Sequence, residues 1–316
     1  MISFRFHIIS LVSMFLALAL GVVVGSTYVD RAIVDSLRNR IDTVSGNLDE
    51  RLVDLERLSS SVQRLEDYAR DSAPFAVGAR LVDTPVVVVA ERGVDDGQAE
   101  QLVLLLAQAG AVAPGVLWFE SKWSLSAEAD RIQLADALSL TTTTPDGERA
   151  AAWRAVVDEL VSPPSDSPPP PSALATLIDM GFLTFQAVGS TDDTVTGLVG
   201  TGPRVLYVSR ERSDVAVDDL VTRMTEILVA NNVLTVVAEV GPDDTDAERL
   251  TEPDTVTEQV RSIPRLRAAV ATVDHARLEQ GKVASVLALS ELSTGVVGHY
   301  GYAASADRVI PEWVSP

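Results

Sequence analysis

The feature that most constrains this chain is an uncharged apolar segment near its N-terminus. Residues 8–29 read IISLVSMFLALALGVVVGSTYV, without a single acidic or basic side chain. A helix of that length, rising 1.5 Å per residue, roughly matches the ~30 Å hydrocarbon core of a bilayer. The alternative is a cleaved signal peptide with Ala17-Leu18-Ala19 as its cleavage site, but the apolar run continues well past Ala19. We therefore predict that residues 1–29 form a short tail and a retained transmembrane anchor.

The charges that flank this segment do not by themselves fix its orientation. Arg5 precedes it, whereas Arg31, Arg38 and Arg40 follow it. A short N-terminal tail before a long domain is nevertheless the usual arrangement of a signal anchor. We expect a single-pass protein of the cell membrane or envelope whose bulk is extracytoplasmic. The spacing of Gly21 and Gly25 would let two anchor helices approach closely.

Residues 30–72 contain no proline and carry a sustained heptad repeat. One core position holds Val34, Ile41, Leu48, Leu55, Val62 and Ala69, and the other holds Leu37, Val44, Leu58 and Leu65. Arg51 interrupts the second set. This pattern predicts a coiled-coil stalk roughly 60 Å long, although a long helix packed on its own domain would also fit. Chains anchored at the same end would pair in parallel, as a homo- or hetero-oligomer, and Arg51 would set register or partner choice.

Residues 75–316 predict an extracytoplasmic α/β domain. Valine-rich runs alternate with amphipathic segments, which is typical of a doubly wound, mostly parallel sheet. A proline-rich loop at 162–171 is interpreted as a spacer, and two smaller lobes divided there are the alternative. The expected strands are residues 84–90, 111–119, 182–188, 205–209, 233–240, 268–273 and 284–289; the expected helices are 95–109, 126–138, 147–161, 173–180 and 217–230.

Composition excludes several classes of function. The net charge of −20 would repel a phosphate backbone, so nucleic acid is not an expected partner. Cysteine is absent, which rules out disulfides, thiolate metal sites and cysteine nucleophiles. Only three histidines are present, at positions 7, 275 and 299.

Motifs that would indicate an enzyme are also absent. Gly200-Thr-Gly202-Pro203 lacks the third glycine of a dinucleotide loop and precedes a strand, so it is interpreted as a turn. The acidic run at 243–248 lacks the ligand spacing of a calcium loop. Asp274-His275 at a strand end and His299-Tyr300-Gly301 in a glycine-rich turn are interpreted as structural. The sequence therefore predicts no catalytic residues.

Segments at both ends resemble the actinobacterial copper transport protein family. They are MISFRFHIISLVSMFLALALGVVVGS at the N-terminus, and ATVDHARLEQGKVASVLALSEL followed by GVVGHYG near the C-terminus. The order of helix, stalk and α/β domain is similar over essentially the whole chain. The resemblance implies an envelope protein with a role in copper export or resistance, copper as its metal, and a place in the outer membrane.

The residues themselves offer copper few ligands. Copper(I) prefers thiolate and thioether sulfur, and only Met180 and Met224 lie beyond the anchor. Neither these methionines nor His275 is carried over as a ligand, and His299 in the GHYG motif is the one candidate metal ligand. The alternative function is a non-enzymatic coiled-coil adaptor that docks a cell-wall or cell-division partner outside the membrane.

Overall fold

The computed structural model describes residues 4–142, 144–163, 172–189, 195–210, 213–241 and 255–312. Most of the proline-rich loop and the whole acidic run at 243–248 lie outside these residues. The chain divides into two compact units, Met1–Leu65 and Glu66–Pro316.

Helix α1 (Phe4–Val77) includes both the apolar segment and the heptad region without a break. Its length of 74 residues corresponds to about 110 Å at 1.5 Å per residue. The helix ends shortly after Pro74, which lacks an N–H to donate, and Ala79 then takes a left-handed φ of 58°. A continuous helix is what the heptad requires, but pairing needs a second chain and stays a prediction.

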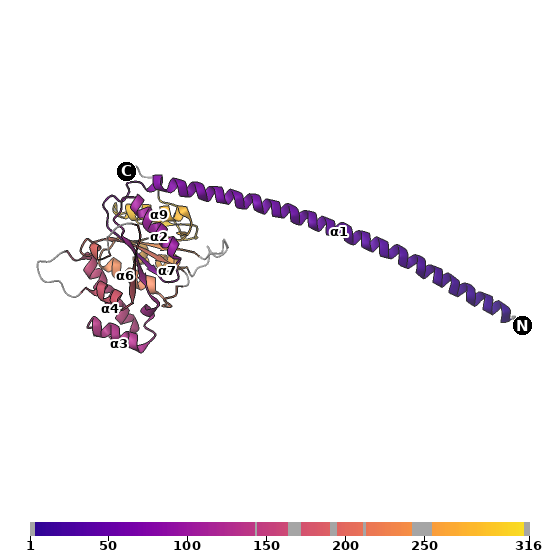
Figure 1. Cartoon of the computed structure of the whole chain (residues 1–316), viewed down its shortest axis with the longest axis horizontal. Helices are drawn as coiled ribbons and strands as arrows, with labels where there is room; N and C mark the ends of the chain where they lie inside the picture. Colours follow the sequence, from indigo (N-terminus) through magenta and orange to yellow (C-terminus); the bar gives the residue numbers. More distant parts are fainter. Residues whose placement is uncertain are drawn as a thin grey trace. The chain divides into compact units, whose positions relative to one another are not determined.

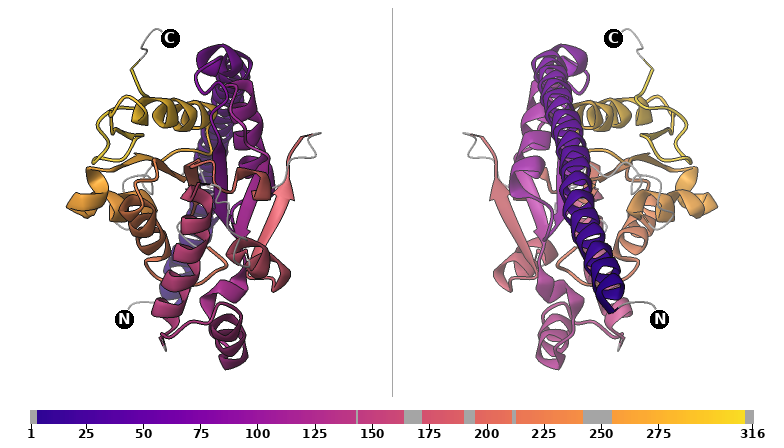
Figure 2. Two further views of the ribbon diagram at one scale, coloured as in Figure 1. Left: turned by 90° about the vertical axis from the view of Figure 1, so that its left-hand side faces the viewer. Right: turned by 90° about the vertical axis from the view of Figure 1, so that its right-hand side faces the viewer.

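The second unit contains one seven-stranded sheet in the order β3-β2-β1-β4-β5-β6-β7. Strand β3 is antiparallel to β2, and all other neighbouring pairs are parallel. The mostly parallel α/β sheet predicted from the valine runs is confirmed, and Figure 2 shows β3 at one edge. The strands are β1 (Val86–Glu91), β2 (Gly115–Phe119), β3 (Leu183–Ala187), β4 (Arg204–Ser209), β5 (Thr235–Glu239), β6 (Val270–Val273) and β7 (His299–Tyr300).

Helices cover both faces of this sheet, because the central strands alternate between two hydrophobic clusters. In β1, Val87 and Val89 belong to one cluster, whereas Val86, Val88 and Ala90 belong to the other. The end of α1, α2 (Asp96–Gln108) and α9 (Glu279–Leu292) pack on the second cluster, and Figure 1 shows α2 beside α9. The first cluster is covered by α3 (Glu128–Ala137), α4 (Pro145–Val161), α5 (Ala173–Asp179), α6 (Leu220–Ala230), α7 (Val256–Ser262), α8 (Pro264–Arg267), and the short 3-10 helices η1 (Ser121–Ser124) and η2 (Val195–Leu198).

Two local predictions about the C-terminal part are wrong. Residues 284–289 were expected to form a strand, but they lie within α9. A short apolar run fits a buried helix as well as a strand, and its alanines and leucines favour the helix. Helix α9 is buried on almost every side because it contacts β4, β5, β6 and α2. The second error concerns His299 and Tyr300, which form edge strand β7 instead of a turn.

Candidate functional site

The carboxyl edge of the sheet gathers polar residues at the ends of parallel strands. Strands β1, β4 and β5 end in Glu91, Ser209 and Glu239, and Asp274 directly follows β6. Strand β1 lies between β2 and β4, so the direction of strand order reverses between β1 and β4. Open α/β sheets bind ligands outside the carboxyl ends of their strands at such a switch point.

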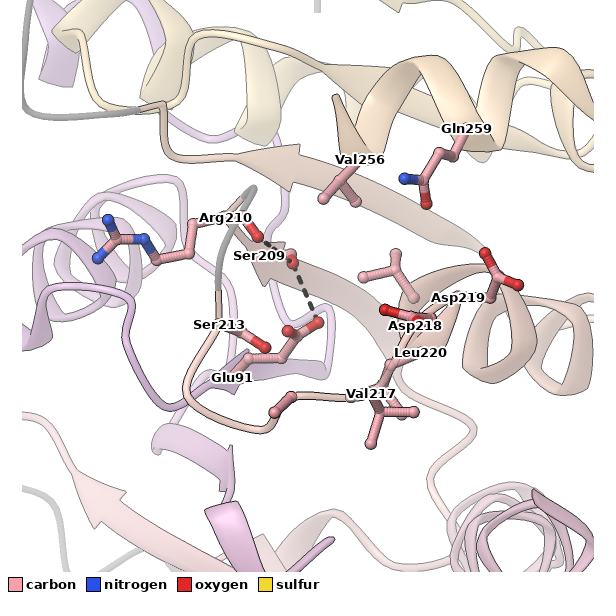
Figure 3. A pocket seen from close by; sticks show the side chains of 12 residues that line it. Glu91, Ser209, Arg210, Ser213, Val217, Asp218, Asp219, Leu220, Val256 and Gln259 are labelled. Atoms are coloured by element: carbon pink, nitrogen blue, oxygen red, sulfur yellow. Dashed lines mark hydrogen bonds between the residues drawn. The ribbon is translucent and has the colours of Figure 1, made fainter. Parts of the chain in front are cut away.

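A cavity of about 280 Å³ opens at this point. Glu91 and Ser209 contribute from the ends of β1 and β4, and Val256 and Gln259 contribute from α7 (Figure 3). The loop before α6 supplies further walls. Sequence reasoning missed this site. Its signal is a polar residue directly after an apolar run, as in VVVVAE and VLYVS, but only the strand order shows that these two ends are neighbours.

Beside β6 the structure holds a buried ion pair. Arg261 on α7 donates from Nη1 to Asp274 Oδ2 at 2.9 Å, from Nη2 to the Tyr300 carbonyl at 3.0 Å and from Nε to Thr272 Oγ1 at 2.7 Å. Asp274 also accepts the backbone N–H of Tyr302 at 2.7 Å. Burial alone would raise the pKa of Asp274, but the neighbouring imidazole, the Tyr302 N–H and the Arg261 charge together hold that pKa below its ordinary value. These contacts fasten the segment after β7 onto β6 and α7.

His299, the predicted copper ligand, has both ring nitrogens occupied. Nε2 lies 3.1 Å from the Arg267 carbonyl, which can only accept, so this nitrogen carries the proton. Nδ1 lies 2.9 Å from Thr272 Oγ1 and accepts from that hydroxyl. Burial, together with the charges of Arg261 and Arg267, lowers the pKa of His299, which favours the neutral imidazole. A metal ion at either nitrogen would have to displace one of these partners, and ligation by His299 stays a prediction.

The ring nitrogens of His275 have fewer hydrogen-bond partners than those of His299. The His275 side chain is 1% exposed, and neither of its ring nitrogens has a hydrogen-bond partner within the described ranges. Nδ1 lies 3.6 Å from Asp274 Oδ1, a polar contact just beyond hydrogen-bond distance that still helps to lower the pKa of Asp274, and the ring lies 4.7 Å from that of Tyr302, centroid to centroid. In the part of the chain that the structure covers, no group of three or more His, Cys, Asp or Glu residues is placed to hold a metal ion.

Comparison with known proteins identifies the family. The family model described as "Copper transport outer membrane protein, MctB" matches residues 1–311. The chain belongs to the MctB family. The proteins named "Copper transporter MctB" from Mycobacterium bovis and from two strains of Mycobacterium tuberculosis are each 27% identical to it over 325 aligned residues. The alignment covers 95% of this chain and 96% of each relative, so the expected family resemblance is confirmed.

The match to the MctB family includes the anchor. Within the described residues, Phe4–Gly25 is the one helical stretch long and apolar enough to cross a membrane, with a mean hydropathy of 2.6. This agrees with a single-pass membrane protein. Within the described part of the chain, a Cβ at Gly21 or Gly25 would meet no atom within 4 Å, so a second helix could approach there.

In this MctB family member, the predicted stalk residues lie on α1, the helix that also contains the apolar segment. The side chains of Leu37, Ile41, Val44, Leu48, Leu55, Leu58, Val62 and Leu65 are exposed in the single chain. The side chain of Val34 lies outside the described part. A row of exposed aliphatic residues with a heptad spacing is the pattern that coiled-coil pairing buries, and pairing itself remains to be tested.

Proposed function

We propose that this chain takes part in copper transport at the cell envelope as a membrane-anchored component. The observation that carries the proposal is the family match, which extends from the anchor through the stalk and the α/β unit. The mycobacterial relatives aligned along nearly their whole length bear the name of copper transporters. The adaptor alternative is not favoured by this match, and membership of a transporter family supports a function other than catalysis.

Deletion of the gene tests this proposal. The deletion strain is expected to accumulate copper and to grow less well at high copper concentration, because export is the role that the family implies. Cell-associated copper, measured by mass spectrometry, checks the result. The full-length chain should restore both properties, whereas a chain without residues 1–29 should restore neither. Unchanged copper content and tolerance in the deletion strain would refute the proposal.

Copper binding by His299 needs a separate measurement on the purified full-length chain. The prediction requires His299→Ala to reduce copper affinity at least tenfold and His275→Ala to leave it unchanged. The opposite outcome would move the site to His275, whose nitrogens have no hydrogen-bond partner among the described residues.

We also propose that two copies pair in parallel through the stalk. One transmembrane helix cannot enclose a path for an ion, so transport by this chain requires further helices from other copies or partners. The exposed aliphatic stripe fits a second copy, because identical chains anchored at the same end present the same heptad in register. Arg51 would then face its counterpart in the core and lower the stability of the pair.

Because the chain has no cysteine, single cysteines can test the pairing directly. Leu55→Cys, at a predicted core position, should give a covalent dimer on mild oxidation in membranes. Ser60→Cys, on the outer side of the same heptad, should give at least tenfold less. Electrophoresis without reducing agent checks the yield. Equal yields at both positions would contradict the heptad register, and absence of dimer at both would contradict pairing.

A further inference from the structure

Three acidic side chains are buried at the carboxyl edge of the sheet, and two of them have evident structural partners. Glu239 accepts the N–H of Val256 at 3.4 Å and the N–H of Thr257 at 3.0 Å, each on a different oxygen. It thereby holds the start of α7. Asp274 pairs with Arg261 and accepts backbone N–H groups. Both carboxyl groups are accounted for by the fold.

Glu91 is different. It is 3% exposed, and its Oε1 accepts from Tyr207 OH at 3.1 Å and from Ser209 Oγ at 3.0 Å. Within the ranges that the structure describes, no backbone N–H donates to its carboxyl group and no Lys or Arg nitrogen lies within 4.0 Å of it. Burying a carboxylate without a cation is costly, and burial raises the pKa of Glu91, with the Ser213, Ser209 and Tyr207 hydroxyls opposing it only in part.

The position of Glu91 suggests a binding role that would explain why its carboxyl group is buried despite the energetic cost. Glu91 faces the cavity at the switch point (Figure 3), where a bound group can reach it. Arg210, the one cation among the lining residues that the structure describes, extends away from it and donates to the Gly93 carbonyl. At the low dielectric of a buried site, the attraction between Glu91 and a cation that reached it is stronger than at the surface.

The remaining walls limit the size and shape of what can bind. Val217, Leu220 and Val256 give the cavity an apolar side, whereas Asp218 and Asp219 are exposed acids in its lining. A volume of about 280 Å³ falls just below the usual range of roughly 300–1,000 Å³ for ligand sites. The cavity therefore suits a small occupant that presents an apolar part to this side.

We propose that the switch-point cavity binds a small organic cation, with its ammonium group on Glu91 and its apolar body against Val217, Leu220 and Val256. This goes beyond copper transport and does not depend on it. A metal ion is a poorer fit, because no three His, Cys, Asp or Glu residues in the described part of the chain come together to hold one.

A matched pair of probes tests the charge requirement on the full-length chain in detergent. 3-Methylbutylamine and 3-methylbutanol have the same apolar body, but only the amine carries a charge. Ligand-observed NMR should show saturable binding of the amine alone. Glu91→Gln should weaken it at least tenfold, whereas Glu226→Gln, on the exposed side of α6, should leave it unchanged. Equal binding of both probes, binding of neither, or unchanged affinity in Glu91→Gln would each overturn the proposal.

Thermal unfolding separates a binding role for Glu91 from a structural one. The groups that face its carboxyl are the hydroxyls of Tyr207, Ser209 and Ser213, with Asp218 and Asp219 in the lining. Because the pKa is raised in the folded state, ionising Glu91 costs stability as pH rises. Glu91→Gln keeps an acceptor for the hydroxyls and should raise the melting temperature by a few degrees at pH 7, with the gain fading towards pH 4–5.

Glu239→Gln is the matched control at the end of β5. Both of its oxygens accept backbone N–H groups, and an amide NH₂ in place of one oxygen would face a donor. This variant should lower the melting temperature. Loss of stability in Glu91→Gln as large as in Glu239→Gln would show that Glu91 is structural and would overturn the proposal.

Discussion

Arg261→Leu is expected to lower the free energy of unfolding of the α/β unit by about 3–5 kcal/mol, because it leaves the buried Asp274 carboxylate without its cation. The side chains of Arg261 and Asp274 are only 1% and 6% exposed, so water cannot replace the lost partner. The Tyr300 carbonyl and Thr272 hydroxyl lose a donor as well. Urea unfolding followed by the fluorescence of the buried tryptophans at positions 118, 123 and 153 would measure the change.

Two further variants show whether the charge is the cause. Adding Asp274→Asn to Arg261→Leu removes the unpaired charge and should recover a large part of the loss. Arg267→Leu breaks an ion pair with Asp307 in which both side chains are at least 40% exposed, and it should cost at most about 1 kcal/mol. Equal losses in Arg261→Leu and Arg267→Leu would contradict the assigned role of the buried pair.

Lowering the pH should remove the stabilising effect of ionised Asp274 from the wild-type chain. The pKa of Asp274 is lower in the folded state than in the unfolded chain, so its stabilising effect is complete above about pH 4 and is lost as pH falls through the folded pKa. The difference in unfolding free energy between wild type and Asp274→Asn should therefore be largest near neutral pH and shrink below about pH 4. A difference that grew on acidification would contradict the sign of the shift.

Gly281→Ala should be comparably destabilising, by about 3 kcal/mol, at the upper end of the usual cost of overpacking. A Cβ at this position would lie 2.0 Å from the His275 carbonyl oxygen and 2.5 Å from its carbonyl carbon. Since both are backbone atoms, α9 would have to move away from the loop that follows β6. The same urea titration measures the effect.

Gly197→Ala is the matched control in the same unit. Among the described residues, no atom lies within 4 Å of a Cβ placed there, so a change of less than about 0.5 kcal/mol is expected. Similar losses at both positions would show that the close approach of α9 to His275 is not the cause. The glycine in the EQGK segment that carried the family resemblance thus has a packing reason.

The elements predicted best are those with a continuous pattern. The apolar segment and the heptad region were each expected to be helical and both lie in α1, and the valine runs at β1, β4 and β5 were placed to within a few residues. Residues 284–289 were misassigned because burial on all sides removes the periodicity that separates helix from strand. The length of the segment could have corrected this, since apolar residues recur from Val283 to Leu292, which is longer than most strands.

The site residues were harder to predict because their partners are distant in sequence. His299 was selected from a motif, but its ring nitrogens meet Thr272 and the Arg267 carbonyl, 27 and 32 positions away. Glu91 was overlooked for the same reason, since Tyr207 and Ser209 lie 116 and 118 positions away. A single sequence does not contain the strand order that brings such residues together.

Strand β7 and the residues that follow it are the last part of the sheet to be synthesised. Strand β7 pairs with β6, Tyr302 donates to Asp274, and Tyr300 forms a bridge with Arg308. Until these residues have been synthesised, β6 is an open sheet edge and Asp274 lacks its backbone donors, a state prone to aggregation. The sheet can therefore be completed only after residues 299–308 have been synthesised, and a chain interrupted before position 299 would keep an open edge at β6.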